Sequence, residues 1–175
     1  LLFCRRPLRQ LDGVTIALTT ESSTTVLLLR LLLEQRYELQ PASYQSGAPG
    51  PEAEAVLLIG DEALKFRAAN RRYPYEIDLA FEWWLWQHLP FVFAVWAVRR
   101  DCDPEGKQRL TRALFRALAA NTGRLDALAK ARAETLGLPA EELRQYLAQF
   151  VYRLGESEEQ GIKTFERLLD EHRLR

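Results

Sequence analysis

The sequence predicts an α/β fold, with an α/β unit over residues 1–98 followed by a segment over residues 99–175 that contains only helices. Short apolar runs of strand length alternate with helical segments up to residue 98. Beyond Arg99 the apolar residues recur at helical spacing in four segments, which Gly123, Gly137 and Gly155 separate. The chain has 175 residues, of which 47% are hydrophobic and 27% charged, so it is long enough to bury a core. This near-average composition excludes a disordered or fibrous protein.

Six apolar or β-branched runs are expected to form strands, over residues 1–4, 14–18, 37–42, 55–59, 75–77 and 91–98. The continuous run 55–59 is typical of a central parallel strand that is buried on both faces. Helices are expected over residues 26–36 and 62–69, and from an N-cap at Asp78 to Gln87. Glycine, proline and serine are frequent between residues 43 and 54, which predicts a loop.

The second half is expected to form helices over residues 104–121, 124–135, 139–149 and 157–172. The chain has no methionine and opens on an apolar run that is typical of the inside of a strand, so we expect it to be the later part of a longer protein. The runs 1–4 and 91–98 could then be crossings between two lobes. Residues 1–98 would form one α/β lobe with its crossing strands, and residues 99–175 would be a helical segment packing on the other lobe.

The charges and cysteines restrict the partners. The chain has 24 Lys and Arg residues against 24 Asp and Glu, and neither half is a basic patch. Nucleic acid and an anionic membrane surface are therefore not expected as partners. The apolar runs are shorter than the ~20 residues of a membrane helix. Cys4 is expected to be a buried apolar residue and Cys102 to be exposed, with no zinc spacing or disulfide framework, which favours a cytoplasmic protein.

Six serine and threonine residues lie between Thr19 and Thr25, after a predicted strand and at the start of a long helix. The first backbone N–H groups of a helix have no partner within the helix, and the helix dipole places partial positive charge there. Hydroxyl groups add further donors, so the segment could bind a carboxylate or phosphate without lysine or arginine. The alternative is a helix N-cap, for which one hydroxyl is enough.

Gly60 and Asp61 follow the predicted central strand. Open α/β sheets bind ligands beyond the carboxyl ends of their strands, so Asp61 could accept a hydrogen bond from a ligand hydroxyl. It could equally cap the helix that is expected to start at Glu62. The two roles are compatible.

Three tryptophans, Trp83, Trp84 and Trp86, lie within four residues. They cannot all lie on one face of a helix, so at least one is expected to face solvent or a partner. His88 and His172 are the two histidines, and neither has a sequence neighbour that suggests catalysis. The sequence contains no catalytic triad order, phosphate-binding loop, dinucleotide fingerprint or zinc-protease motif.

Three blocks of the chain together resemble the chorismate dehydratases of the futalosine route to menaquinone. They occur in the same order and at similar spacing, at residues 18–26, at residues 55–64, and at residues 78–83 with 89–97. The resemblance covers residues 1 to about 100 well and the helical segment weakly. It implies a two-lobed fold similar to type II periplasmic binding proteins, with the active site in the cleft and the first motif upstream of Leu1.

The resemblance also implies the reaction and its site. Chorismate, a dicarboxylate, would lose water to give 3-[(1-carboxyvinyl)oxy]benzoate, with no metal and no organic cofactor. A substrate carboxylate would be held by the hydroxyl-bearing residues of the first block, namely Thr20, Ser22, Thr24 and Thr25. Gly60 and Asp61 would lie at the cleft floor or hinge. The work of the protein would be mainly to orient the substrate.

The sequence departs from the family at two places, since Ala80-Phe81 stands where Gly-Glu is common and Gln87-His88 where Thr-Gly is usual. A sister enzyme, 1,4-dihydroxy-6-naphthoate synthase, has a similar lobe with a catalytic histidine after the strand. Here that strand is followed by Gly60-Asp61, which favours the dehydratase. Two other interpretations stay open: a non-catalytic binding protein for a small carboxylate, and the effector domain of a regulator.

Overall fold

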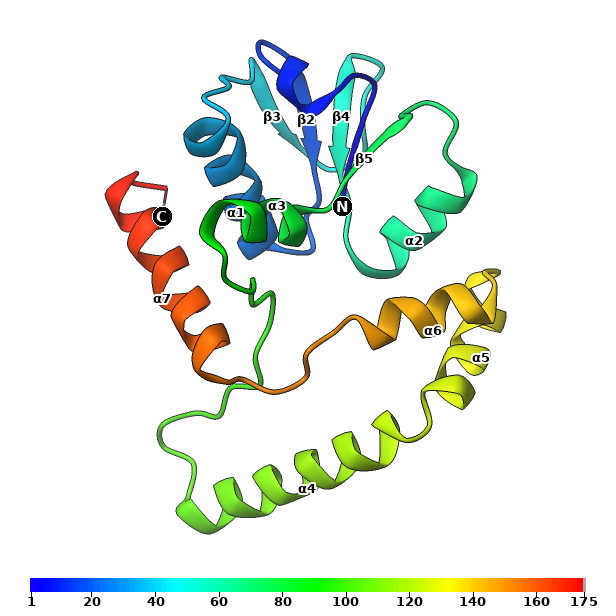
Figure 1. Ribbon diagram of the computed structural model, residues 1–175, viewed down its shortest axis with the longest axis vertical. Helices are drawn as coiled ribbons and strands as arrows, with labels where there is room; N and C mark the ends of the chain where they lie inside the picture. The colour runs from blue at the N-terminus through cyan, green and yellow to red at the C-terminus, as the bar shows by residue number, and fades with distance from the viewer. Residues whose placement is uncertain (175) are drawn as a thin grey trace. The chain divides into compact units, whose positions relative to one another are not determined.

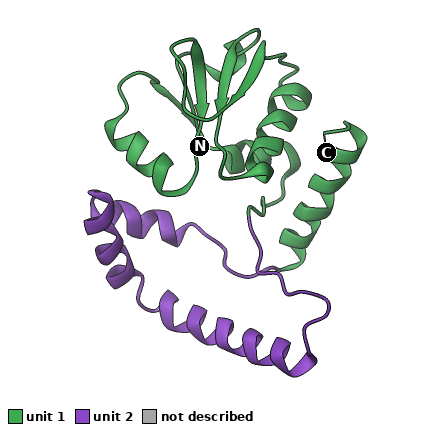
Figure 2. Ribbon diagram, turned by 180° about the vertical axis from the view of Figure 1, so that it is seen from behind, with its two compact units in different colours: residues 1–93, 155–175 green, residues 94–154 purple. Residues whose placement is uncertain are grey.

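The computed structural model describes residues 1–174. The chain forms two compact units (Figure 2). We call Leu1–Phe93 with Gly155–Arg175 the sheet unit, and Ala94–Leu154 the helical unit. In this division the last helix clusters with the sheet and not with the helices that precede it.

Five strands form one mixed sheet in the order β3–β2–β4–β1–β5 (Figure 1). Their bounds are Leu2–Cys4 for β1, Thr15–Leu18 for β2, Ser43–Ser46 for β3, Ala53–Leu57 for β4 and Tyr75–Ile77 for β5. Strand β2 runs parallel to β3 and β4, whereas β1 runs antiparallel to β4 and β5. Strand β4 is therefore central, as its continuous apolar run predicted, and the α/β class is confirmed.

The helices of the sheet unit are α1 (Ser23–Leu31), α2 (Gly60–Ala69), α3 (Leu79–Gln87) and α7 (Glu156–Glu171), with a short 3-10 helix at Leu8–Gln10. Because successive strand residues point to opposite faces, the sheet has two apolar surfaces. Leucines of α1, α3 and α7 cover one surface and form the main core with strand residues such as Ile16 and Leu57. The other surface carries a smaller cluster, in which Ala63 of α2 packs with Phe3 and Val56.

Helix α1 continues into a π-helical turn, Leu32–Arg36, and the strand predicted at residues 37–42 is wrong. Strand β3 begins at Ser43, inside the predicted loop. The reason is a turn: Glu38 has a left-handed φ of 55°, so the chain reverses direction before it can pair. The preceding Tyr37 is held by Glu82, whose carboxylate accepts a hydrogen bond from the Tyr37 hydroxyl. The same carboxylate forms an ion pair with Arg36 at 2.8 Å.

Helix α3 begins as predicted, because Asp78 Oδ1 accepts hydrogen bonds from the backbone N–H groups of Ala80 and Phe81. The tryptophans divide as expected. Trp83 is fully buried, whereas Trp84 is 49% exposed. The helix therefore anchors itself through one tryptophan and leaves another on the surface.

The helical unit contains α4 (Pro104–Thr122), α5 (Leu125–Leu136) and α6 (Ala140–Ala148), close to the predicted bounds. Helices α5 and α6 bury small apolar side chains, including Ala129, Ala133 and Leu143. The strand predicted at residues 91–98 is wrong, since these residues have no ladder partner within the described part of the chain. A β-prone run forms a strand only beside a neighbour, and here Trp96 is 85% exposed. No helix among residues 1–174 has the length and hydropathy to cross a membrane.

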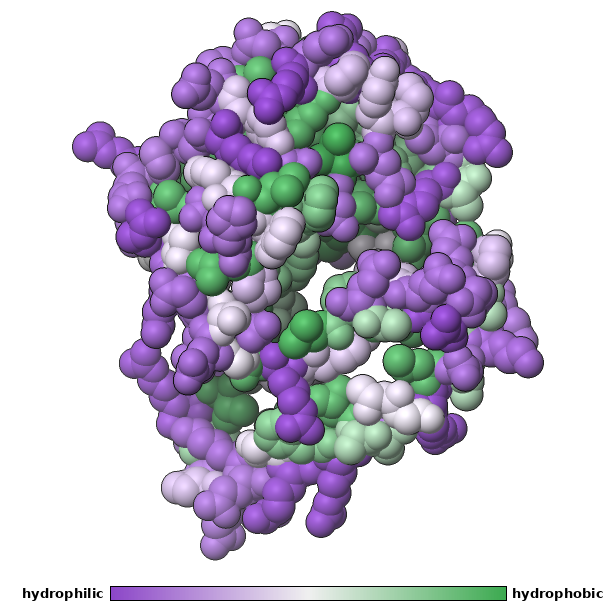
Figure 3. Space-filling model, in the orientation of Figure 1, coloured by the Kyte–Doolittle hydropathy of each residue, from purple (hydrophilic) through white to green (hydrophobic). Residues whose placement is uncertain are grey.

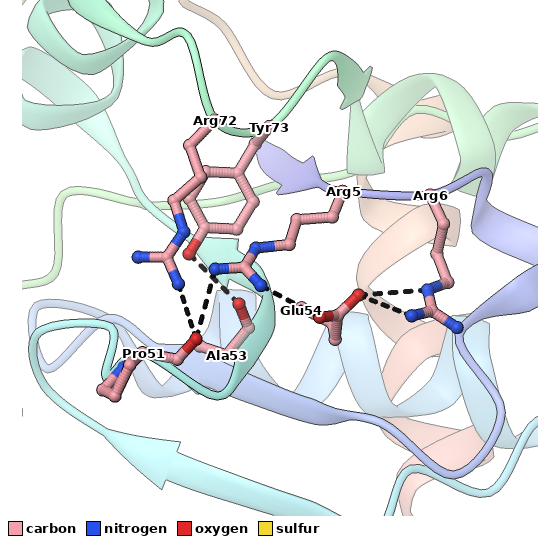
Figure 4. A network of polar contacts seen from close by, with 7 residues as sticks. All are labelled: Arg5, Arg6, Pro51, Ala53, Glu54, Arg72 and Tyr73. Atoms are coloured by element: carbon pink, nitrogen blue, oxygen red, sulfur yellow. Dashed lines mark hydrogen bonds and ion pairs between the residues drawn. The ribbon is translucent and has the colours of Figure 1, made fainter.

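A polar network closes the end of the sheet at which β4 begins (Figure 4). The Glu54 carboxylate accepts hydrogen bonds from Arg5 at 3.1 Å and from Arg6 at 2.8 Å. Arg5 and Arg72 both donate to the carbonyl oxygen of Pro51, at 3.2 and 2.6 Å. Two guanidinium groups thus share one carboxylate, and the network ties the end of β1 to the start of β4.

Candidate functional site

The candidate site lies at the end of the sheet opposite the Glu54 network. Strands β2 and β4 are parallel neighbours, with Ala17 opposite Val56, so their carboxyl ends lie at one edge. The chain leaves β2 into the hydroxyl-rich segment and α1, and it leaves β4 into α2. The two segments singled out from the sequence, Thr19–Thr25 and Gly60-Asp61, are therefore placed at the same edge of the sheet although they lie far apart along the chain. This edge is the position favoured for ligands in α/β folds.

The start of α1 is capped by Ser22, whose backbone is extended. Its Oγ accepts a hydrogen bond of 3.1 Å from the N–H of Thr25 and lies 2.9 Å from the Thr25 hydroxyl oxygen. Thr25 is buried, with 3% of its surface exposed. The capping interpretation is therefore confirmed for Ser22, and both side chains are committed to shaping the turn.

Three of the other hydroxyls are available to a ligand, whereas that of Thr19 is buried and accepts a hydrogen bond of 3.2 Å from the N–H of Glu21. Thr20 is exposed and Thr24 is half-buried in the first turn of α1. Within residues 1–174 neither side chain has a hydrogen-bond partner, and nor does that of Ser23. The N–H groups of the first helical turn add donors beside them. This arrangement suits a carboxylate, which accepts several hydrogen bonds from hydroxyl and amide groups.

The start of α2 differs from the prediction. Its N-cap is Ile59, which has no side chain able to cap, and Asp61 lies inside the first turn and not at the cap. The capping role considered for Asp61 is therefore wrong. Gly60 has a φ of +56°, a left-handed conformation that glycine adopts without strain and that lets β4 turn sharply into the helix. Asp61 is half-buried and engages in interactions of its own.

Two further residues lie at this edge and were not identified as site residues from the sequence. Ser46 ends β3 opposite Leu18 and is exposed. Asp78 directly follows β5. The last residue of β5, Ile77, pairs with Leu2, and Leu2 pairs on its other side with Leu57 at the end of β4, so Asp78 lies at the same edge. Their position follows from strand order and direction, which local sequence patterns do not encode. The placement of β3 inside a predicted loop concealed Ser46 in particular.

Other features singled out from the sequence lie elsewhere. His88 caps the C-terminus of α3 with a left-handed φ of 55°, is exposed, and packs edge-on against Trp84 with ring centroids 6.0 Å apart. Cys4 is buried in the core, and burial raises the pKa of its thiol to about 12. Among residues 1–174 no group of three His, Cys, Asp or Glu side chains is arranged to hold a metal ion.

Two surface hollows, of about 250 and 550 Å³, lie within the helical unit. The smaller is lined by residues such as Leu118 and Tyr152, and the larger by Lys130 and Arg144 among others. Neither includes the hydroxyl-rich segment or Asp61. Neither hollow is therefore the candidate site, which is the sheet edge with its hydroxyl and amide donors.

Comparison with known proteins decides the family. A family model described as menaquinone biosynthesis matches residues 1–171. The chain belongs to this menaquinone biosynthesis family. It is 39% identical over 169 residues to a chorismate dehydratase of Thermus thermophilus, an alignment that covers 86% of this chain and 60% of that relative. The chain thus spans about 60% of the length of this curated relative. The resemblance inferred from the three sequence blocks is confirmed.

Proposed function

We propose that the protein to which this chain belongs is a chorismate dehydratase, a hydro-lyase that converts chorismate to 3-[(1-carboxyvinyl)oxy]benzoate. The observation that carries the proposal is the convergence of the hydroxyl-rich start of α1 and the start of α2 on one sheet edge. The similarity to a chorismate dehydratase along most of the chain supports this enzyme over a non-catalytic carboxylate-binding protein.

The start of α1 is proposed to hold one substrate carboxylate. Thr20 and Thr24 donate from hydroxyls that have no partner among the described residues, and the neighbouring backbone N–H groups donate with them. Ser22 and Thr25 act differently, because their hydrogen bonds to each other fix the shape of the turn. The helix dipole supplies the positive potential that a near-neutral chain does not supply through a basic patch.

The start of α2 is proposed to bind the substrate hydroxyl group that is lost as water. Asp61 and Glu62 already place negative charge in the first turn of α2, so this helix end is poorly suited to a second carboxylate. A half-buried aspartate can instead accept a hydrogen bond from the substrate hydroxyl and orient it. Loss of that hydroxyl and of a ring proton makes the ring aromatic, which favours elimination. The proposed mechanism therefore consists of positioning and hydrogen bonding, without a metal or organic cofactor.

The fold proposed for the whole protein has two lobes, similar to type II periplasmic binding proteins, and the sheet unit is one of them. Residues of the other lobe, which lie outside this chain, would cover the apolar residues exposed in the helical unit, such as Trp96 and Val151. The cleft would then open along the sheet edge described above. The two cysteines are free thiols, which supports a reducing, cytoplasmic setting.

The test of the function is incubation of the full-length protein with chorismate, followed by mass spectrometry. Loss of one water from the substrate is the expected result, and a substrate that stays intact contradicts the proposal. The site is tested by Thr24→Val, which keeps the shape of the side chain and removes its hydroxyl. An unpaired carboxylate contact corresponds to about 1–3 kcal/mol, so kcat/KM is expected to fall by about 5- to 150-fold. Thr24→Ser, which restores the hydroxyl, serves as the matched control, and an unchanged kcat/KM in Thr24→Val would show that the helix start is only a cap.

A further inference from the structure

The chain leaves the sheet unit and returns to it through two segments. It leaves after α3 through Pro90 and Phe91, and the unit ends at Phe93. It returns at Gly155, where the Glu158 carboxylate accepts a 2.8 Å hydrogen bond from the Gly155 N–H and so starts α7. Within residues 1–174, the chain passes between the sheet unit and the helical unit only at these two segments.

A close backbone contact joins the outgoing segment and α7. Gly161, in the second turn of α7, is buried against the carbonyl group of Pro90. A Cβ atom at position 161 would overlap the Pro90 carbonyl oxygen, and this neighbour is backbone that cannot rotate away. Glycine is needed here for close approach and not for its φ angle, since the residue is helical.

An aromatic cluster surrounds this contact. The ring of Phe91 lies 5.0 Å from that of Phe165 in α7 and 5.4 Å from that of Trp83 in α3, with the rings edge to face in both pairs. Phe165 and Trp83 are themselves 6.0 Å apart, and Phe93 stacks edge-on against Phe91 at 4.7 Å. These four ring pairs therefore have the edge-to-face geometry that aromatic pairs prefer. The outgoing segment is thus held between α3 and α7.

We propose that Gly161 is a positioning residue: its contact with Pro90 locks the outgoing segment and α7 into one joint, so that the two connections move together. Any movement of the sheet unit relative to the rest of the protein is then confined to the residues just beyond the joint, at Phe93–Ala94 and Leu154–Gly155. The inference rests on the proposed function where it concerns catalysis, because a two-lobed enzyme must set its cleft to match the transition state. The joint itself stands on the contacts above.

The test is Gly161→Ala in the full-length protein, measured by hydrogen exchange and steady-state kinetics. The added methyl group must push α7 away from Pro90, so the helical amides of α7 at residues 161–165 are expected to exchange at least about tenfold faster, while those of β2 and β4 keep their protection. With chorismate, kcat is expected to fall by about tenfold and KM to change less than about twofold, because a small misplacement affects catalysis more than binding. Gly123→Ala is the matched control, since a Cβ there meets only ordinary contacts of 3.8 Å or more.

A second pair of variants separates positioning from general destabilisation. Phe165→Leu loosens the same joint without adding atoms, and it covers the case in which Gly161→Ala does not fold. It is expected to raise exchange at residues 161–165 as well. Leu168→Ala also weakens α7, but through the core below α1 and not through Pro90. It should lower the melting temperature while leaving kcat at a temperature well below unfolding unchanged.

Two results would overturn the proposal: wild-type exchange at residues 161–165 in both Gly161→Ala and Phe165→Leu, or a loss of kcat in Leu168→Ala equal to that in Gly161→Ala. The failure of the proposed function has a different signature. If the wild-type protein does not dehydrate chorismate, the exchange comparison still decides whether the joint exists.

Discussion

Helices α1 and α4 both carry an apolar face, yet they differ in what that face does. Helix α1 has nine residues, and four of them are buried: Thr25, Leu28, Leu29 and Leu31. Helix α4 has nineteen residues and buries none within the described part of the chain. Figure 3 shows the consequence as hydrophobic surface along α4. The sheet unit contains its own core, whereas the helical unit exposes apolar side chains that we expect to pack against another part of the protein.

This difference shows how stability and function are divided. Large exposed apolar surfaces in soluble proteins mark interaction sites, and most of the large exposed apolar residues lie in the helical unit. The proposed ligand-binding groups lie in the sheet unit, where the core holds them in place. We expect matched changes in the two units to have unequal effects, and three pairs of residues test this from the largest difference to the smallest.

The cysteines give the largest expected difference. Cys4 is fully buried in the sheet unit, and burial raises the pKa of its thiol to about 12, whereas Cys102 in the helical unit is half-exposed. Because the thiolate is the reactive form, iodoacetamide at about pH 8 should modify Cys102 faster than Cys4 by about 1000-fold or more. Peptide mass spectrometry of the native protein over time measures both rates. Equal rates would show that β1 opens readily and that the sheet unit has no stable core.

Leucine substitutions give the next difference. Leu29→Ala removes a fully buried side chain from the main core and should lower the free energy of unfolding by about 3 kcal/mol. Leu114→Ala in α4 removes a side chain that is only half-buried, and alanine favours the helix, so we expect a change below about 1 kcal/mol in this 175-residue chain. Urea unfolding followed by circular dichroism compares them. A Leu114→Ala effect as large as that of Leu29→Ala would mean that α4 is covered.

Local sequence patterns predicted most of the helices and four of the five strands because each has its own periodicity or cap. Asp78, for example, is predicted to cap a helix and does so, and one hydroxyl residue of the segment 19–25, Ser22, caps α1. The patterns failed where the outcome depends on a distant neighbour. Residues 91–98 have strand-like composition but no partner strand here, and β3 is polar enough to resemble a loop until its pairing with β2 is known.

The candidate site was predictable in part for the same reason. The hydroxyl-rich segment stands out by composition, and Gly60 and Asp61 stand out by following an apolar run. Their placement at one edge depends on β2 and β4 being parallel neighbours, which no local pattern specifies. The separate tasks of the hydroxyls could not be predicted either, because they depend on the capping geometry of Ser22.

The smallest expected difference concerns two glutamates that are each paired with arginine. Glu54 in the sheet unit is partly buried; burial alone would raise its pKa, but hydrogen bonds and charges from Arg6 and Arg5 outweigh it and lower the pKa. Glu141 in the helical unit is exposed, and its hydrogen bonds from Arg144 and Gln145 lower its pKa to about 2. Exposed pairs contribute little to stability, so Glu141→Gln should leave unfolding unchanged.

Glu54→Gln should lower the free energy of unfolding by about 1 kcal/mol at neutral pH, because two guanidinium groups lose their shared carboxylate. A carboxylate whose pKa is lower in the folded state stabilises above its unfolded pKa, and that contribution disappears as pH falls through the folded value. The difference between wild type and Glu54→Gln should therefore shrink as the pH is lowered into the acid range. Urea unfolding at a series of pH values measures it. A difference that is independent of pH would show that Glu54 acts through packing, and the contrast with Glu141 would then have no electrostatic basis.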